Sequence, residues 1–161
     1  MTPQRIEDGY ENIKRIIDFL IGLNDIKYVA SLDAPSNFDA MVDHYKEHGI
    51  FHVYSGGDND IYLGLNYNIK FRALHDFMHY TNNLTFSFKD ERILSEITAK
   101  QFNVIGWRVF GMTIAECYDV SDIINAEMKG QIDYYELNKK YVADQKAFIN
   151  DYLLDRDLKA C

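Results

Sequence analysis

The chain has 161 residues, of which 47% are hydrophobic and 14% aromatic, so it can bury the core of one domain and is not a disordered chain. Its formal net charge of −8 disfavours nucleic acid and anionic membrane surfaces as partners. Only two prolines are present, and no apolar run approaches the roughly 18–20 residues of a membrane span, which favours a mostly helical protein without a transmembrane segment.

The two cysteines and the N-terminal residues predict the cellular compartment of the protein. Cys117 and Cys161 are isolated from each other and do not make a disulfide framework. The first residues are too polar for a signal peptide. We therefore expect a protein of the reducing cytoplasm.

The first predicted helix begins near Pro3 and ends near residues 22–24. Apolar side chains recur along it at spacings of three and four, which places them on one face of the helix: Ile6, Tyr10, Ile13, Ile17 and Leu20. We interpret this face as a packing surface of the core.

A second helix is predicted between a capping signal at residues 36–39 and a stop at Gly49. His44 and His48 lie one turn apart on it, so they are a rival pair for a metal ion. No carboxylate lies between them on the same arc, and we interpret them as part of a solvated face.

Two short runs of aromatic and β-branched residues flank a Gly/Asp/Asn cluster, and this pattern predicts a small β-hairpin near residues 51–63. Four more helices are expected. The predicted fold class is therefore a single-domain bundle of about six helices, with a metal-motif core at about residues 67–153. They are predicted at about 68–80, from Ser87 towards Trp107, from Thr113 to about 135, and from about 143 onwards. Trp107 is predicted to be a core residue.

The helix at about 68–80 carries the candidate chemistry. On a helical wheel at about 100° per residue, Arg72, His75, Asp76 and His79 share one arc and can converge on a point. Two histidines one turn apart with a carboxylate suit Zn²⁺, and also Fe²⁺ or Mn²⁺. The same residues also fit a hydrogen-bonded core network in which Arg72 balances Asp76, and both interpretations stay open.

One helix cannot close a coordination sphere, so a ligand must come from elsewhere in the chain. Glu91 is the predicted donor, because it lies in the first turn of the next helix and heads a largely apolar face. A further acid, Glu127, is interpreted either as an additional ligand or proton shuttle or as a surface residue.

The string His75-Asp76-x-x-His79, followed after eleven residues by Glu91, resembles the HDxxH-x11-E metal motif of the coenzyme Q biosynthesis metal-binding proteins. Arg72 and the pair Tyr134-Tyr135 are similar to that family as well. The resemblance implies a helical protein in which His75, Asp76, His79 and Glu91 hold zinc or another divalent ion, and a link to modification of a quinone head group.

The sequence also departs from that family. Asp90 stands where the family commonly has glycine before the glutamate, and Asn82-Asn83 replace a glycine-containing turn. The N-terminal third does not map onto the family. In combination with residues 71–76, the predicted hairpin resembles small uncharacterised proteins of tailed phages.

Three classes of function follow as expectations, and in the third, a host-interaction protein with no metal site, His75 and His79 are core residues. The first is a metal-dependent lyase, decarboxylase or hydrolase acting on a small aromatic or quinone-like molecule, with Asp76, Glu91 and Arg72 as catalytic residues. The second is a non-catalytic scaffold or interaction module with a structural metal or no metal, and with another protein or a second copy of the chain as its partner.

Overall fold

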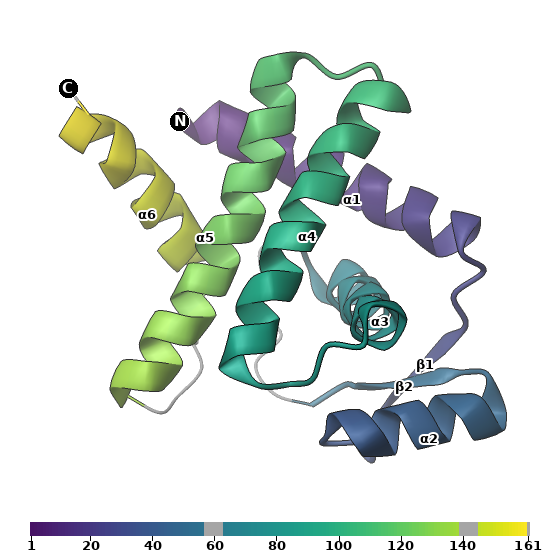
Figure 1. Ribbon diagram of the computed structural model, residues 1–161. Helices are drawn as coiled ribbons and strands as arrows, with labels where there is room; N and C mark the ends of the chain where they lie inside the picture. The colour runs from purple at the N-terminus through teal and green to yellow at the C-terminus, as the bar shows by residue number, and fades with distance from the viewer. Residues whose placement is uncertain (57–62, 139–144, 161) are drawn as a thin grey trace. The chain divides into compact units, whose positions relative to one another are not determined.

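The computed structural model describes residues 1–56, 63–138 and 145–160 of the chain. These residues form a mostly helical protein with six helices and one small sheet, which confirms the predicted fold class. In chain order the elements are α1 (Pro3–Leu23), β1 (Tyr28–Ser31), α2 (Phe38–His48), β2 (Phe51–Tyr54), α3 (Leu65–Asn82), α4 (Phe88–Arg108), α5 (Ile114–Asn138) and α6 (Gln145–Ala160) (Figure 1).

The chain divides into two compact units. Residues 1–16, 60–62 and 95–161 make up unit 1, and residues 17–59 and 63–94 make up unit 2, so α1 and α4 each contribute to both. The prediction of a single domain over residues 1–161, with a metal-motif core at about residues 67–153, stays a prediction.

Unit 1 is built around the first half of α1 together with α5 and α6, and Figure 1 shows α5 and α6 side by side. The apolar face predicted for α1 is confirmed, because all five of its residues are buried. Gly9 allows a close approach, since a Cβ at this position would collide with Ile123 of α5. An ion pair between Arg5 and Asp119 joins the same two helices.

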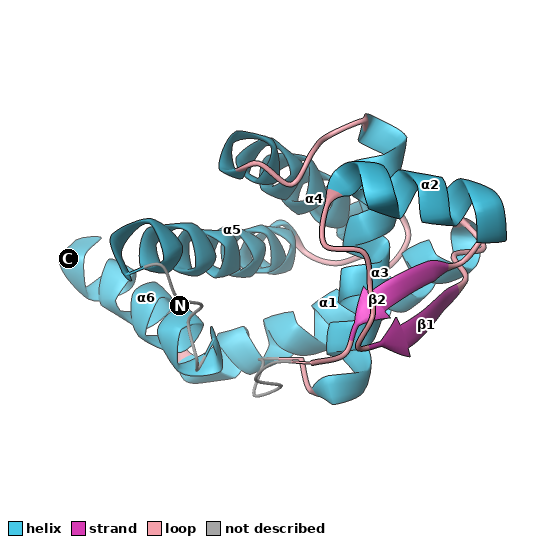
Figure 2. Cartoon of the chain, turned by 90° about the horizontal axis from the view of Figure 1, so that it is seen from below, coloured by secondary structure: helices cyan, strands magenta, loops and turns pink. Residues whose placement is uncertain are grey.

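Unit 2 contains the sheet, in which β1 and β2 pair in parallel with Tyr28 opposite Phe51 and Ser31 opposite Tyr54 (Figure 2). The strand predicted at 51–54 therefore exists, and its partner among the described residues is β1, which was not predicted. Parallel strands need a long crossover, and α2 supplies it. The other predicted arm, around residues 61–63, lies largely outside the described residues.

The limits of α2 follow the predicted capping signals. Asn37 is the N-cap, and its side-chain oxygen accepts a hydrogen bond of 2.9 Å from the backbone N–H of Ala40. Gly49 ends the helix in the left-handed region at φ 67°, where it donates to the carbonyl of Tyr45. Phe51 and Val53 of β2 are buried, and the Phe51 ring contacts Tyr45 of α2.

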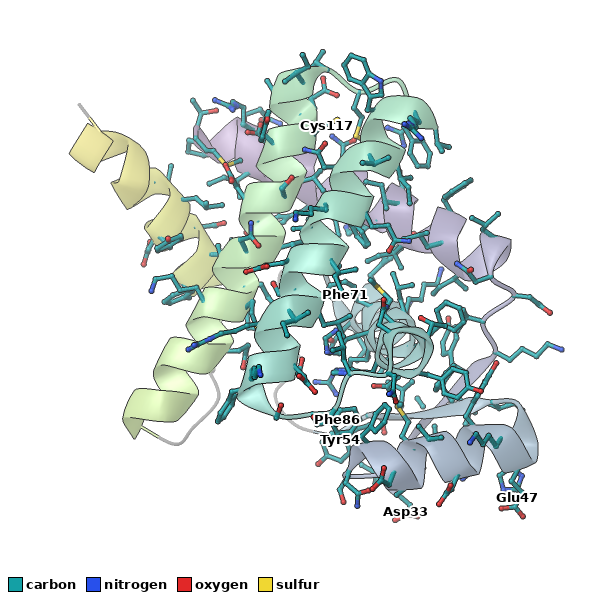
Figure 3. All side chains as sticks on the ribbon, viewed as in Figure 1. Asp33, Glu47, Tyr54, Phe71, Phe86 and Cys117 are labelled. Carbon is teal, nitrogen blue, oxygen red and sulfur yellow. The ribbon has the colours of Figure 1, made fainter. Side chains whose placement is uncertain are left out.

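One core prediction is wrong. The Trp107 side chain is 56% exposed at the end of α4, beside Ile114 and Tyr118 in a shallow pocket of unit 1 that also reaches Cys117, labelled in Figure 3. In the part of the chain that the structure describes, none of the helices combines the length and the apolar character that crossing a bilayer requires.

Candidate metal centre

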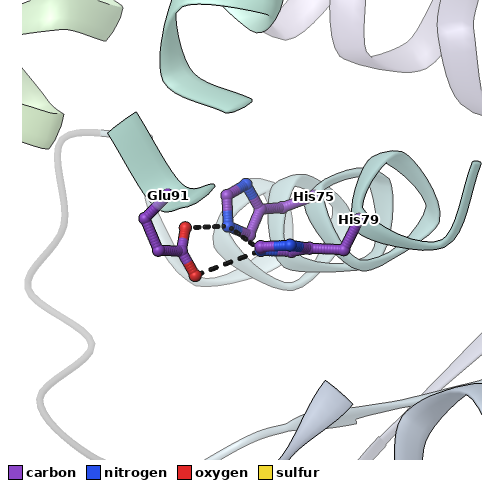
Figure 4. A group of neighbouring side chains, drawn as sticks. All are labelled: His75, His79 and Glu91. Carbon is purple, nitrogen blue, oxygen red and sulfur yellow. Dashed lines mark hydrogen bonds and ion pairs between the residues drawn. The ribbon is translucent and has the colours of Figure 1, made fainter. Parts of the chain in front are cut away.

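Three side chains from two helices of unit 2 meet at one point (Figure 4). His75 and His79 lie one turn apart on α3, and their Nε2 atoms are 3.0 Å from each other. Glu91 of α4 places one carboxylate oxygen 2.9 Å from His75 Nε2 and the other 3.1 Å from His79 Nε2. The predicted convergence of the two histidines with Glu91 is confirmed as geometry.

The turn between α3 and α4 brings Glu91 back to the histidines. Asn83 caps α3 in the left-handed region at φ 51°, a conformation that asparagine tolerates better than most residues. The Ser87 hydroxyl then accepts a hydrogen bond from the backbone N–H of Asp90, and α4 begins. The Asp90 carboxylate in turn accepts from Thr85, which holds the turn closed one residue before Glu91.

His79 is completely buried, and its ring orientation is set by the same turn. Its Nδ1 lies 2.8 Å from the carbonyl oxygen of Leu84, which can only accept a hydrogen bond, so Nδ1 carries a proton. In the neutral imidazole this leaves Nε2 with a lone pair that faces His75 and Glu91. A backbone carbonyl that fixes the tautomer is a common arrangement behind metal-binding histidines.

The proton count at this triangle requires a positive charge. Glu91 is an acceptor when ionised, and neutral His79 offers only a lone pair at Nε2, so two acceptors face each other at 3.1 Å. One proton on His75 Nε2 can serve the contacts that His75 makes with Glu91 and His79, but it cannot serve the contact between His79 and Glu91. Either the His79–Glu91 pair takes up a further proton, or a cation satisfies all three contacts at once.

The dimensions of the triangle fit a cation. Two ligands at about 2.0–2.1 Å from one tetrahedral ion lie roughly 3.3 Å apart. The two Nε2 atoms are 3.0 Å apart, and each lies 2.9 or 3.1 Å from a different carboxylate oxygen of Glu91, so each of these pairs needs to move apart by only a few tenths of an ångström. His75 and Glu91 are 28% and 22% exposed, which leaves one side of the site open to solvent.

The charge state of Glu91 suits the same function. Burial opposes ionisation of its carboxyl group, but hydrogen bonds and charge from His75 and His79 outweigh it and lower the pKa to about 2. In metal-free protein the charge that keeps this carboxylate ionised therefore lies on the imidazoles, and a bound cation would take its place when the imidazoles are neutral ligands.

Asp76 lies on α3 but outside the triangle. It is not a member of the group of three whose ligand atoms lie within 4.8 Å of one another. Burial raises its pKa to about 6, although the neighbouring imidazoles of His75 and His79 oppose the shift. Its predicted role as a ligand stays a prediction, and the structure describes it as an ionisable group beside the site.

The remaining predicted residues are placed as follows. Arg72 donates a hydrogen bond to the backbone carbonyl of Tyr54 at the end of β2, and its charge lowers the pKa of Asp76. Glu127 belongs to α5 in unit 1, and its role stays a prediction. The side chains of Tyr134 and Tyr135 lie outside the described part of the chain.

Sequence reasoning did not find Leu84. Its contribution is a backbone carbonyl, so its side chain carries no signal. The asparagine pair before it does indicate a left-handed helix end, which is the feature that directs this carbonyl towards His79. Comparison with protein-family models, with curated proteins and with solved structures finds no match to this chain.

Proposed function

We propose that the chain is a divalent-metal-binding protein whose ion is held by His75, His79 and Glu91. The observation that carries this proposal is the proton count, because His79 Nε2 and a Glu91 carboxylate oxygen face each other at 3.1 Å as two acceptors, and one cation would satisfy both together with His75. Zn²⁺ is the first candidate for two imidazoles and one carboxylate, and Fe²⁺ and Mn²⁺ are the alternatives.

We propose further that the ion serves catalysis. Three protein ligands leave at least one coordination position for water or substrate, and the partial exposure of His75 and Glu91 makes that position accessible. A bound ion supplies Lewis-acid chemistry. Asp76, with a pKa of about 6, can accept and return a proton near neutral pH.

The substrate proposal rests on the resemblance to the coenzyme Q biosynthesis metal-binding proteins. It favours a small aromatic or quinone-like molecule and a lyase, decarboxylase or hydrolase reaction. Arg72 would neutralise a carboxylate on such a substrate, since its guanidinium is permanently charged.

A structural ion is the second candidate, and one observation favours it. His75 and His79 belong to α3 while Glu91 belongs to α4, so an ion at this point would tie the two helices together across their turn. A structural zinc is closed by four protein ligands, whereas a catalytic one keeps a position for water. Recruitment of Asp76 as the fourth ligand would indicate the structural role.

The test is the metal content of protein purified without chelators, measured by elemental analysis. About one equivalent of divalent metal is expected in the wild type, and much less in His75→Ala and Glu91→Gln, with helical circular dichroism retained. Glu96→Gln is the matched control, because it removes an acid from the same helix outside the triangle and should leave the metal in place.

Three outcomes separate the proposals. Metal-free wild-type protein that also binds no added Zn²⁺, Fe²⁺ or Mn²⁺ would contradict the metal site. Cobalt-substituted protein with a water-bearing, exchangeable position supports catalysis, because the visible spectrum of Co²⁺ reports its coordination. A closed four-ligand spectrum that changes in Asp76→Asn supports the structural role.

A further inference from the structure

A second group of histidines lies in unit 2, away from the first in the sequence. The chain has five histidines, and of the three that do not belong to the first site, His44 contacts both of the others. His44 and His48 come from α2, with ring centroids 4.5 Å apart. His52 comes from β2, and its ring centroid is 4.2 Å from that of His44.

The local fold explains why these three rings meet. His44 and His48 are one turn apart, so they share a face of α2. Gly49 then turns the chain into β2, where Phe51 and Val53 point into the core and His52, between them, points to the other face. The prediction of a solvated face is therefore confirmed for His48, which is 49% exposed, but it is wrong for His44, which is half-buried under two other rings.

His44 carries the clearest sign of a missing ligand. Its Nε2 atom is buried and has no hydrogen-bond partner among the described residues. A buried nitrogen without a partner is unfavourable, and native structures rarely leave one so. Burial, followed by the neighbouring imidazoles, lowers the pKa of His44, which keeps the ring neutral and its lone pair available.

We propose that His44, His48 and His52 form a second metal site, which takes a borderline divalent transition-metal ion such as Zn²⁺, Ni²⁺ or Cu²⁺. Imidazole nitrogens suit these ions, whereas Ca²⁺ and Mg²⁺ prefer oxygen ligands. The site resembles the first in one respect only, which is a pair of histidines one turn apart on a helix.

This second site should be the weaker of the two. The described residues contain one group of three ligand atoms within 4.8 Å of one another, and that group is the first site. His44, His48 and His52 are not such a group, so their rings must turn before the nitrogens can share an ion. His48 is free to do so because it is exposed, and Glu47, 3.7 Å from its Nε2, adds a negative charge nearby.

The cluster also lies where an ion can reach it. Figure 3 shows Glu47 projecting from the outer side of α2, and its side chain is 75% exposed. An ion arriving from solvent would meet the exposed His48 before the half-buried His44. Binding would thereby satisfy the buried nitrogen of His44 and join α2 to β2.

The experiment is calorimetric titration with Zn²⁺ in a background that lacks the first site, His75→Ala/Glu91→Gln. This background is expected to bind about one equivalent of Zn²⁺, more weakly than the wild type binds its first. Adding His52→Ala, and separately His44→Ala, should lower the remaining affinity about ten- to a hundredfold. Lys46→Gln on the same turn of α2 is the control and should retain the equivalent.

Loss of all Zn²⁺ binding in the background, or binding that survives both histidine substitutions, would overturn the proposal. If a variant fails to fold, ¹⁵N-histidine NMR of the wild type decides instead, because only five imidazoles have to be assigned. Zn²⁺ added beyond the first equivalent should then shift the ring nitrogens of His44, His48 and His52. Unchanged signals from all three would reject the second site while leaving the first one intact.

Discussion

The two histidine clusters of unit 2 begin from the same pattern, a pair one turn apart on a helix, and reach different electrostatic settings. In the first, Glu91 supplies a negative charge and the Leu84 carbonyl fixes the tautomer of His79. In the second, a third imidazole takes the place of the carboxylate, and the buried Nε2 of His44 has no hydrogen-bond partner within the described ranges of the chain. The spacing alone does not distinguish them.

The difference teaches which neighbours prepare a histidine pair for a cation. A carboxylate contributes charge, and an acceptor behind the ring holds one nitrogen free of its proton. A cluster of imidazoles alone contributes donor atoms without charge. The first cluster should therefore bind an ion tightly in its present geometry, and the second only after its rings have turned.

The largest expected effect is at His79. Replacement by alanine removes a completely buried ring and leaves the Leu84 carbonyl without its partner, so His79→Ala should lower the free energy of unfolding by about 2–4 kcal/mol. Urea denaturation of metal-free protein measures this. A decrease in the free energy of unfolding as small as that expected for His48→Ala would contradict the role of the Leu84 carbonyl in fixing the tautomer of His79.

Glu91 should give metal-free protein a stability that depends on acid pH. Its pKa is about 2 in the folded state against the ordinary 4.5, so the carboxylate stabilises the fold above pH 4.5, and this contribution is lost as the pH falls towards 2. The shift corresponds to at most about 3 kcal/mol. Urea denaturation between pH 5 and pH 2 should show this loss in the wild type and lack it in Glu91→Gln.

Asp76 should give metal-free protein a pH dependence of stability opposite to that from Glu91. Its pKa is raised from 3.8 to about 6, so ionisation costs stability as the pH rises through this interval, and none of that cost remains below pH 3.8. Asp76→Asn should therefore stabilise metal-free protein by about 1–3 kcal/mol at pH 7. Thermal or urea unfolding at pH 7 and pH 3.5 checks this, and an equal effect at both pH values would exclude the explanation by charge.

The smallest expected effect is at His48. Its side chain is 49% exposed, and in metal-free protein His48→Ala should change the free energy of unfolding by less than about 0.5 kcal/mol. With excess Zn²⁺, however, the variant should lose the part of the thermal stabilisation that comes from the second site. Identical melting shifts for the wild type and His48→Ala would show that only the first cluster binds.

Much of the helical framework could be predicted from local rules. The apolar spacing from Ile6 to Leu20 defined the buried face of α1, and Gly49 and Ser87 marked helix ends that the structure confirms. Glu91 could be predicted because a carboxylate that heads an apolar face has to point inward.

Long-range pairing could not be predicted in the same way. β1 is four residues long and none of its residues is buried, so its pattern does not identify it as the partner of β2. His52 lies in a strand while His44 lies in a helix, and no single period connects them. Trp107 was assigned to the core from its residue type, which does not determine exposure at a helix end.

The turn at Asn83 has one more consequence. The Leu84 residue that holds His79 through its carbonyl also donates its N–H to the carbonyl of His79, 3.1 Å away. An ion that restricts the motion of the His79 ring should therefore slow hydrogen exchange at the Leu84 amide, a backbone site that is not a ligand. The metal concentration would then determine how often the turn between α3 and α4 unfolds locally. Substitutions at Asn83 would change the affinity for the metal ion without altering any ligand.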